Sequence, residues 1–130
     1  MSLSLSDAKR IAEGAIKKAE ELNIRISVSV ADFGGKLIVF NKMDGGIWGA
    51  NYGCQGKAAA ASAFGIPTSQ IGKLDPLVVE AVDAANGGLF ALGGGGVPIY
   101  RDNVLVGSCG VGGGTGDEDE QCAVAGVSEL

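Results

Sequence analysis

Residues 24–30 read Ile-Arg-Ile-Ser-Val-Ser-Val, a strict alternation of apolar and polar side chains. A period of two predicts a β-strand that buries one face and leaves the other wet or lined by ligand. The turn residues Asp-Phe-Gly-Gly follow at 32–35, and residues 36–41 return to an extended, apolar pattern. The two extended segments are therefore predicted to form a β-hairpin.

Helices are predicted on both sides of this hairpin. Capping hydroxyls at Ser4 and Ser6 precede apolar residues at helical spacing, which predicts a helix from Asp7 to Leu22. After the hairpin, residues 51–64 are dominated by alanine, and Lys57 is their only charged residue. A helix of this composition can lie almost wholly buried against a sheet or another subunit.

The rest of the chain predicts two short helical pieces, three more strands and a final helix. The helical pieces cover residues 69–74 and 76–85, and the final helix runs from Asp117 to Leu130. The strands are expected at 89–92, 97–100 and 104–111. We therefore expect a single α/β (α+β) domain over residues 1–130, with an antiparallel sheet of about five strands flanked by helices.

Composition and charge exclude several classes of partner. The 130 residues carry 10 Lys and Arg against 15 Asp and Glu, a formal net charge of −5, and the basic residues are scattered. Nucleic acid and anionic membrane both require a basic face, so neither is an expected partner. Residues 1–6 lack the features of a secretory leader, and no window approaches the ~18–20 apolar residues that span a bilayer, so a cytoplasmic location is predicted.

The sequence contains no histidine. A Ser-His-Asp or Cys-His nucleophilic site, a histidine-ligated metal and an imidazole acid–base switch are therefore excluded within one chain. Cys54, Cys109 and Cys122 form an odd set without CxxC spacing, which favours buried, reduced thiols over disulfides or a structural zinc site. Any chemistry must use carboxylates, lysine, tyrosine, cysteine or backbone groups.

Two glycine-rich segments, at 93–96 and 112–116, lack the spacing of nucleotide-binding loops. They are interpreted as places of close backbone approach and positive φ, or as the lining of a pocket. The acidic run 117–120 that follows is typical of a helix start matched to the helix dipole. Its alternative is a site for a hard cation, and the candidate pairs are Asp117 with Glu120 and Glu118 with Glu129.

Lys57 stands out as a candidate site residue. A lone ammonium on an alanine-rich helix must reach solvent, pair with a carboxylate or face an anionic ligand. Asp32 and Asp44, in the turns around the hairpin, are its predicted partners in a salt bridge or in proton transfer. Nearby large side chains are interpreted as core packing or as the apolar wall of a site, namely Met43, Trp48, Tyr52 and Phe64.

Several motifs together resemble the GlcG/HbpS-like family, which is described as haem-degrading and includes the C-terminal domain of PduO-type corrinoid adenosyltransferases. The likeness covers nearly all of the chain and rests on Leu5-Ser6-Asp7-Ala8, Val30 to Leu37, Met43-Asp44-Gly45, Lys57-Ala58, Ala63 to Thr68, Gly95 to Ile99 and Gly110 to Ala123. The resemblance implies a profilin-like domain that assembles into symmetric oligomers and binds haem or another small ligand, with iron coordination in some members. Because this chain lacks histidine, the resemblance would place an axial haem ligand at Met43, Tyr52, a cysteine or Thr115.

The leading functional hypothesis is an oligomeric small-ligand-binding protein whose pocket lies between the alanine-rich helix and the sheet, near a subunit interface. Haem is one candidate cofactor, and the residues predicted to line the pocket are Met43, Trp48, Tyr52, Phe64, Gly95, Gly96, Pro98, Gly113 and Thr115. The alternative is a cofactor-independent lyase, isomerase or hydratase of a catabolic pathway, with protons moved by Lys57, Asp32 and Asp44. A third hypothesis is an accessory subunit of a larger catabolic enzyme.

Overall fold

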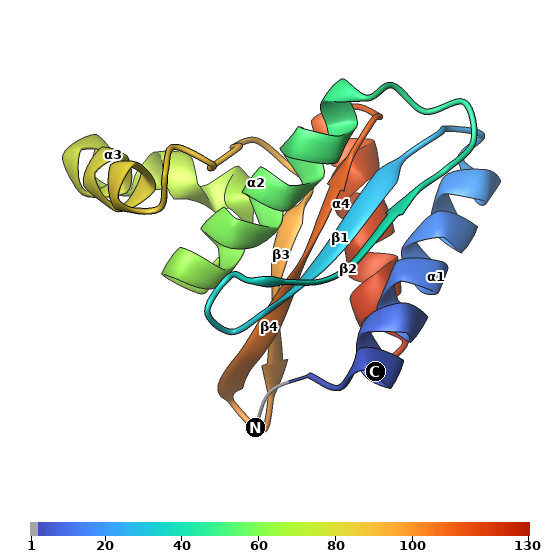
Figure 1. The fold of residues 1–130 in the computed structure, drawn as a ribbon, viewed down its shortest axis with the longest axis horizontal. Helices are drawn as coiled ribbons and strands as arrows, with labels where there is room; N and C mark the ends of the chain where they lie inside the picture. Colours follow the sequence, from blue (N-terminus) through green and yellow to red (C-terminus); the bar gives the residue numbers. More distant parts are fainter. Residues whose placement is uncertain (1–2) are drawn as a thin grey trace.

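The centre of the fold is a four-stranded antiparallel sheet in the order β2-β1-β4-β3 (Figure 1). The computed structural model describes residues 3–130. Met1 and Ser2, the first two of the residues 1–6 in which the sequence predicts no secretory leader, lie outside the described residues. The predicted class, a mixed α+β fold with an antiparallel sheet flanked by helices, is confirmed. The strands are β1 (Ser27–Asp32), β2 (Leu37–Lys42), β3 (Gly96–Arg101) and β4 (Val104–Gly112).

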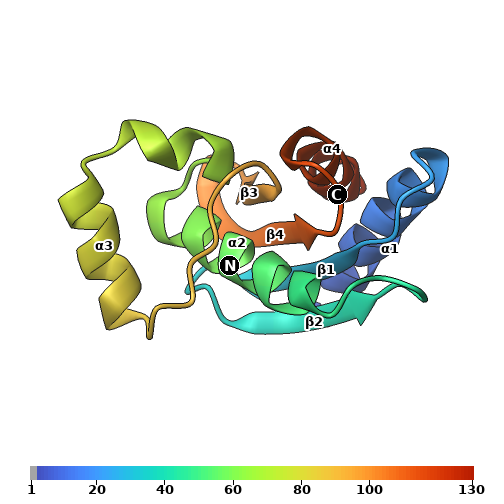
Figure 2. The same cartoon turned by 90° about the horizontal axis from the view of Figure 1, so that it is seen from above.

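Helices cover both faces of the sheet (Figure 2). α1 (Leu5–Glu21) and α4 (Gly116–Val127) pack together on one face, and α2 (Gly49–Phe64) lies on the other. The hydroxyls of Ser4 and Thr115 cap α1 and α4 by accepting hydrogen bonds from backbone amides of the first turn. Among the described residues, no helix combines the length and the apolar character that crossing a bilayer requires.

The alternating side chains of β1 point to the two opposite faces of the sheet, and a different helix layer covers each face. Val28 and Val30 are fully buried in the main core, which α1 and α4 close. Ser27 and Ser29 are buried too, and the Ser29 hydroxyl donates to the Cys54 carbonyl of α2 at 2.8 Å. α2 covers most of the strand face predicted to be wet or lined by ligand, and the hydroxyls of Ser27 and Ser29 bond to that helix.

α2 packs closely on the sheet because neither surface carries a bulky side chain. Residues 58–61, all alanine, are buried, as the composition predicts. Opposite them, Ser108 Oγ donates to the Ala58 carbonyl at 2.6 Å. A Cβ added at Gly110 would collide with the Cys54 carbonyl and lie 2.6 Å from Ala58 N, so this register tolerates only glycine.

The segment between α2 and β3 differs from the prediction in one element. The 3-10 helix η1 (Thr68–Lys73) and α3 (Pro76–Ala85) confirm the two helical pieces, and they extend to one side of the sheet in Figure 1. Residues 89–92 do not form a strand, so the sheet has four strands and not five. This segment crosses α2 instead, at Gly56, where an added Cβ would lie 2.7 Å from Ala91 N.

Gly110→Ala is expected to lower the free energy of unfolding by about 1–3 kcal/mol, because the added methyl group forces α2 away from β4. Urea unfolding followed by circular dichroism measures the change. Gly53→Ala, on α2, is the matched control: its Cβ meets nothing within 4 Å, so the better helix propensity should raise stability by up to about 1 kcal/mol. Equal stability of the two variants would contradict the close packing described above.

Candidate functional site

α2 carries Lys57 toward the end of β4, where its ammonium is held inside the protein. Nζ lies 3.0 Å from Asp119 Oδ2 and 3.0 Å from the Val111 carbonyl oxygen. Only 12% of the Lys57 side chain and 3% of the Asp119 side chain are exposed. These two residues, called the Lys57–Asp119 pair below, tie α2 to β4 and to the first turn of α4.

This geometry corrects the prediction that Asp32 or Asp44 faces Lys57. Asp32 ends β1, and its Oδ1 accepts hydrogen bonds from the backbone amides of Gly34 (2.9 Å) and Lys36 (3.0 Å), which fixes the hairpin turn. Asp44 is exposed in the loop that follows β2. The structure therefore does not bring the three predicted catalytic residues together, and their role in proton transfer stays a prediction.

Asp119 is not among the residues singled out from the sequence. Burial raises the pKa of its carboxyl group, although the hydrogen bonds from Gly114 N (2.8 Å) and from Lys57 act in the opposite direction. The sequence holds only a partial signal for it. Asp119 and Glu120 both have apolar residues three and four positions further on, so helical spacing alone allows either to lie on the buried face.

The glycine-rich segments pass close to the Lys57–Asp119 pair and to β1. A Cβ at Gly95, whose φ is +131°, would lie 2.8 Å from Lys57 Nζ, and one at Gly96 would lie 2.5 Å from the Lys57 carbonyl oxygen. Gly113 has a φ of +122°, and a Cβ there would lie 3.1 Å from Ile26 Cα. Close approach and positive φ are thus confirmed for both segments. Their place in the lining of a ligand pocket stays a prediction.

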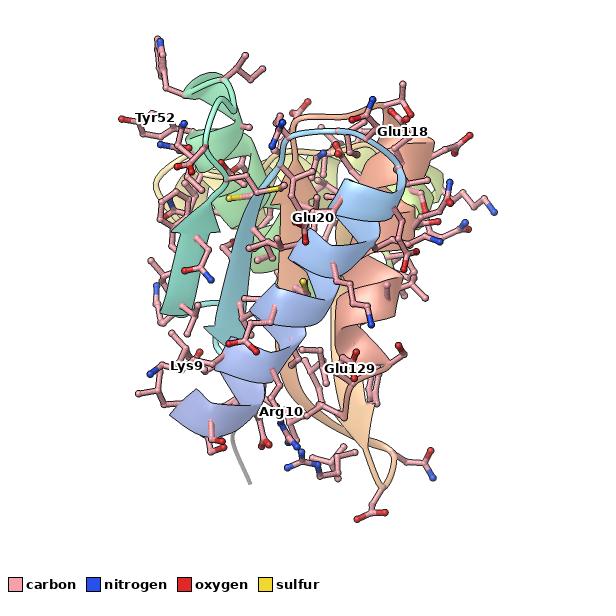
Figure 3. The ribbon with its side chains drawn as sticks, turned by 90° about the vertical axis from the view of Figure 1, so that its right-hand side faces the viewer. Lys9, Arg10, Glu20, Tyr52, Glu118 and Glu129 are labelled. Carbon is pink, nitrogen blue, oxygen red and sulfur yellow. The ribbon has the colours of Figure 1, made fainter. Side chains whose placement is uncertain are left out.

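The large side chains predicted to form one wall lie at separate places. Trp48 and Tyr52, 73% and 65% exposed, meet edge to face at the start of α2, with ring centroids 6.0 Å apart. Figure 3 shows Tyr52 pointing away from the molecule. Phe64, at the other end of α2, packs into a small cluster beside η1 and α3. Met43 packs against the main core, and its Sδ accepts a hydrogen bond from Ile26 N at 3.3 Å.

Asp117 and Glu120, the predicted cation pair, do come together. Both line a shallow cavity of about 540 Å³ at the surface between α1 and α4, with Lys18 beside them. Glu120 Oε1 also accepts a hydrogen bond from Ser69 Oγ at 2.7 Å. Within residues 3–130, no three Cys, Asp or Glu side chains are grouped as a metal site would need, and a cation at Asp117 and Glu120 stays a prediction.

The three cysteines are free and buried, as predicted. Burial raises the pKa of Cys54 and of Cys122 to about 11 each, and it raises the pKa of Cys109 as well. The thiolate is the form of cysteine that binds metal. These thiols therefore remain protonated at neutral pH and offer poor ligands to iron.

The remaining predicted residues differ in whether they have a side-chain atom that is free to ligate iron. Pro98 is half-buried in β3 and offers no side-chain donor. Thr115 Oγ1 accepts a hydrogen bond from Glu118 N at 3.2 Å, as the cap of α4. Of the axial ligands named from the sequence, Tyr52 has an exposed side chain, and its hydroxyl makes no hydrogen bond to the described part of the chain.

Several solved structures share this fold, HbpS and PduOC among them. A crystal structure of a double mutant of HbpS from Streptomyces reticuli is 30% identical, with a TM-score of 0.87, and the match covers 100% of this chain and 88% of that one. A crystal structure of a PduOC:haem complex has a TM-score of 0.88 at 23% identity, covering 100% of this chain and 96% of that one. At that lower identity the second likeness shows a shared fold.

Sequence comparison gives a relative and a family for this chain. The corrinoid adenosyltransferase PduO of Citrobacter freundii is 24% identical over 132 residues; the match covers 100% of this chain and 39% of PduO, so the chain spans well under half of that relative. The family model described as "Haem degrading protein HbpS-like" matches residues 3–128. Since that match leaves out only the two ends of the sequence, the chain belongs to the HbpS-like family.

Proposed function

We propose that this chain binds a small ligand, with haem as the first candidate, and that it does so as an oligomer. Two observations support a ligand of this class. The family is described as haem-degrading, and PduOC, which shares the fold, has been crystallised with haem. The proposal depends on whether a chain without histidine offers any group to the iron.

Tyr52 is the residue that fits this role. Tyrosine oxygen serves as an axial ligand of haem iron in some proteins, and the exposed Tyr52 hydroxyl is free of hydrogen bonds to residues 3–130. Trp48 beside it adds an apolar surface for a planar macrocycle. A bound haem would supply redox chemistry at its iron, and the chain would supply the oxygen ligand and the apolar contact. The exposed Tyr52 hydroxyl is the observation that carries the proposal.

A second copy of the chain is expected to complete this site. Trp48 and Tyr52 are exposed in one copy, so a haem lying on them alone would keep its other face in water. The net charge of −5 also gives the haem propionates little attraction, so affinity must come from iron ligation and apolar contact. Leu77 and Val78 on α3 are 74% and 51% exposed, which adds apolar surface that self-association can bury.

Titration with ferric haem is expected to give a saturable shift of the Soret band for the wild-type protein and binding weaker by about tenfold or more for Tyr52→Phe, which loses the iron ligand. Tyr100→Phe is the matched control, because the Tyr100 hydroxyl donates to the Gly65 carbonyl at 2.7 Å, away from Trp48. Identical curves for wild type and Tyr52→Phe would exclude iron ligation by Tyr52. A wild-type titration without saturation would exclude haem as the ligand.

Sedimentation velocity is expected to show an assembly larger than one chain, and Trp48→Glu is expected to dissociate it, because the substitution places a charge in the surface that self-association buries. Val124→Glu adds the same charge at a 54% exposed position on α4, across the sheet from α2, and should leave the assembly intact. A wild-type protein that sediments as one chain at all concentrations would overturn the oligomeric part of the proposal.

The alternative of proton transfer by Lys57, in a lyase, isomerase or hydratase, gains no specific support from the geometry. The ammonium already donates to Asp119 and to the Val111 carbonyl. The cavities between α1 and α4 and beside the hairpin are lined by other residues. We propose that the Lys57–Asp119 pair is structural and fixes the start of α4 against α2 and β4.

Lys57→Met is expected to lower the free energy of unfolding by about 3–5 kcal/mol at neutral pH, because it leaves the Asp119 carboxylate buried without its counter-charge. The double variant Lys57→Met/Asp119→Asn should recover most of that loss, since the amide oxygen can still accept from Gly114 N. Urea unfolding of the three proteins compares them. A double variant no more stable than Lys57→Met would show that the unpaired charge is not the cause.

A further inference from the structure

Two adjoining cavities lie between α2, the β1–β2 hairpin and the segment that follows α3. Their volumes are about 180 Å³ and about 260 Å³. Gly35 and Asn86 line both cavities, so the two cavities adjoin, and together they are named here the hairpin groove. The groove runs along the second half of α2, from Gln55 to Ala63, and so lies apart from Trp48 and Tyr52 at the start of that helix.

Gly35 lies where the two cavities adjoin. Its φ of +78° is a left-handed conformation that favours glycine. A Cβ at this position would lie 3.6 Å from Ala59 Cα and 3.8 Å from Ser62 Cβ, in the space between the hairpin and α2. The hydrogen bonds that Asp32 accepts from the turn hold the hairpin in this conformation, so the groove is formed before any ligand arrives.

Most polar groups of the groove are already used within the protein. Ser29 Oγ donates to the Cys54 carbonyl at 2.8 Å, and Gln55 Nε2 donates to the Asn51 carbonyl at 2.9 Å. Ser62 Oγ lies 2.7 Å from Ser108 Oγ in a hydrogen bond. The apolar side chains of the lining include Phe33, Leu37, Ala58, Val82, Leu89 and Phe90.

Two polar side chains of the lining, Lys36 and Asn86, remain without a side-chain hydrogen bond or ion pair to the described residues. Lys36 is also the one ionisable residue in either lining. The carboxylates of Asp32 and Asp83 are not part of the lining, and each accepts hydrogen bonds from backbone amides. Lys36 is exposed, and its ammonium without a counter-charge and the free amide of Asn86, beside the apolar side chains of the lining, match an anion with an apolar body.

We propose that the hairpin groove binds a small monocarboxylate with a short apolar tail. The carboxylate meets Lys36 and Asn86, and the tail lies along Leu37 and Leu89. Drug-sized ligands occupy pockets of roughly 300–1,000 Å³, and each cavity here is smaller, so the groove takes a smaller molecule than haem. A phosphate monoester carries more than one negative charge near neutral pH, whereas the lining offers one cation, which favours a carboxylate.

Isothermal titration calorimetry with hexanoate, on the full chain without haem, is expected to show saturable binding. Hexanamide keeps the tail and loses the charge, so it should bind about tenfold more weakly. Lys36→Gln should weaken hexanoate binding by about the same factor, because the charge-assisted contact is lost. Lys9→Gln removes the same charge from α1, on the other side of the sheet (Figure 3), and should leave the affinity unchanged.

Backbone NMR shifts locate the bound hexanoate. The amide signals of Gly35 and Asn86 are expected to move during the titration, and that of Tyr52 is expected to stay in place. Each of four results would overturn the proposal: no saturable binding, equal affinity for hexanamide, equal weakening by Lys9→Gln, or shifts confined to other parts of the chain. The outcome is independent of haem binding, because neither the probe nor the variants touch Tyr52.

Discussion

The close contact between α2 and the sheet is the constraint on which the rest of the structure depends. It requires glycine at 110, alanine along the middle of α2 and short hydroxyl side chains on the strands, which bond to the helix backbone. Because the middle of α2 is devoted to this contact, its aromatic residues lie near the two ends, Trp48 and Tyr52 at the start and Phe64 at the finish. The candidate binding sites of the molecule therefore lie beside α2 and not within the contact between α2 and the sheet.

The Lys57–Asp119 pair is a charged part of the contact between α2 and the sheet. The lysine stem lies within the packed layer, and the ammonium emerges where β4 ends and α4 begins. Gly95 passes so close to Nζ that a side chain there would displace it. A lone lysine on an alanine-rich helix is therefore explained by the joining of three elements, and a ligand is not needed to account for it.

Local patterns predict most elements of this fold, because the alternation in β1, the alanine content of α2 and the proline that opens α3 each act within a few residues. The predictions that are wrong depend on tertiary placement. Residues 89–92 are apolar and extended, but Gly56 lets them cross α2, so no fifth strand forms. The partner of Lys57 lies 62 positions away, and it is brought near by the packing of α2 on β4, which sequence spacing does not reveal. The predicted helix over residues 51–64 already places Tyr52 and Phe64 at its two ends, so a single wall that contains both conflicts with that prediction.

The two proposed binding sites lie along different parts of α2, and none of the three thiols lines either of them. Cys54, Cys109 and Cys122 are enclosed on every side and stay protonated. An oxidant or alkylating agent in solution can meet them only after the layers separate. Chemical damage to these three thiols therefore follows an opening of the structure and does not initiate it.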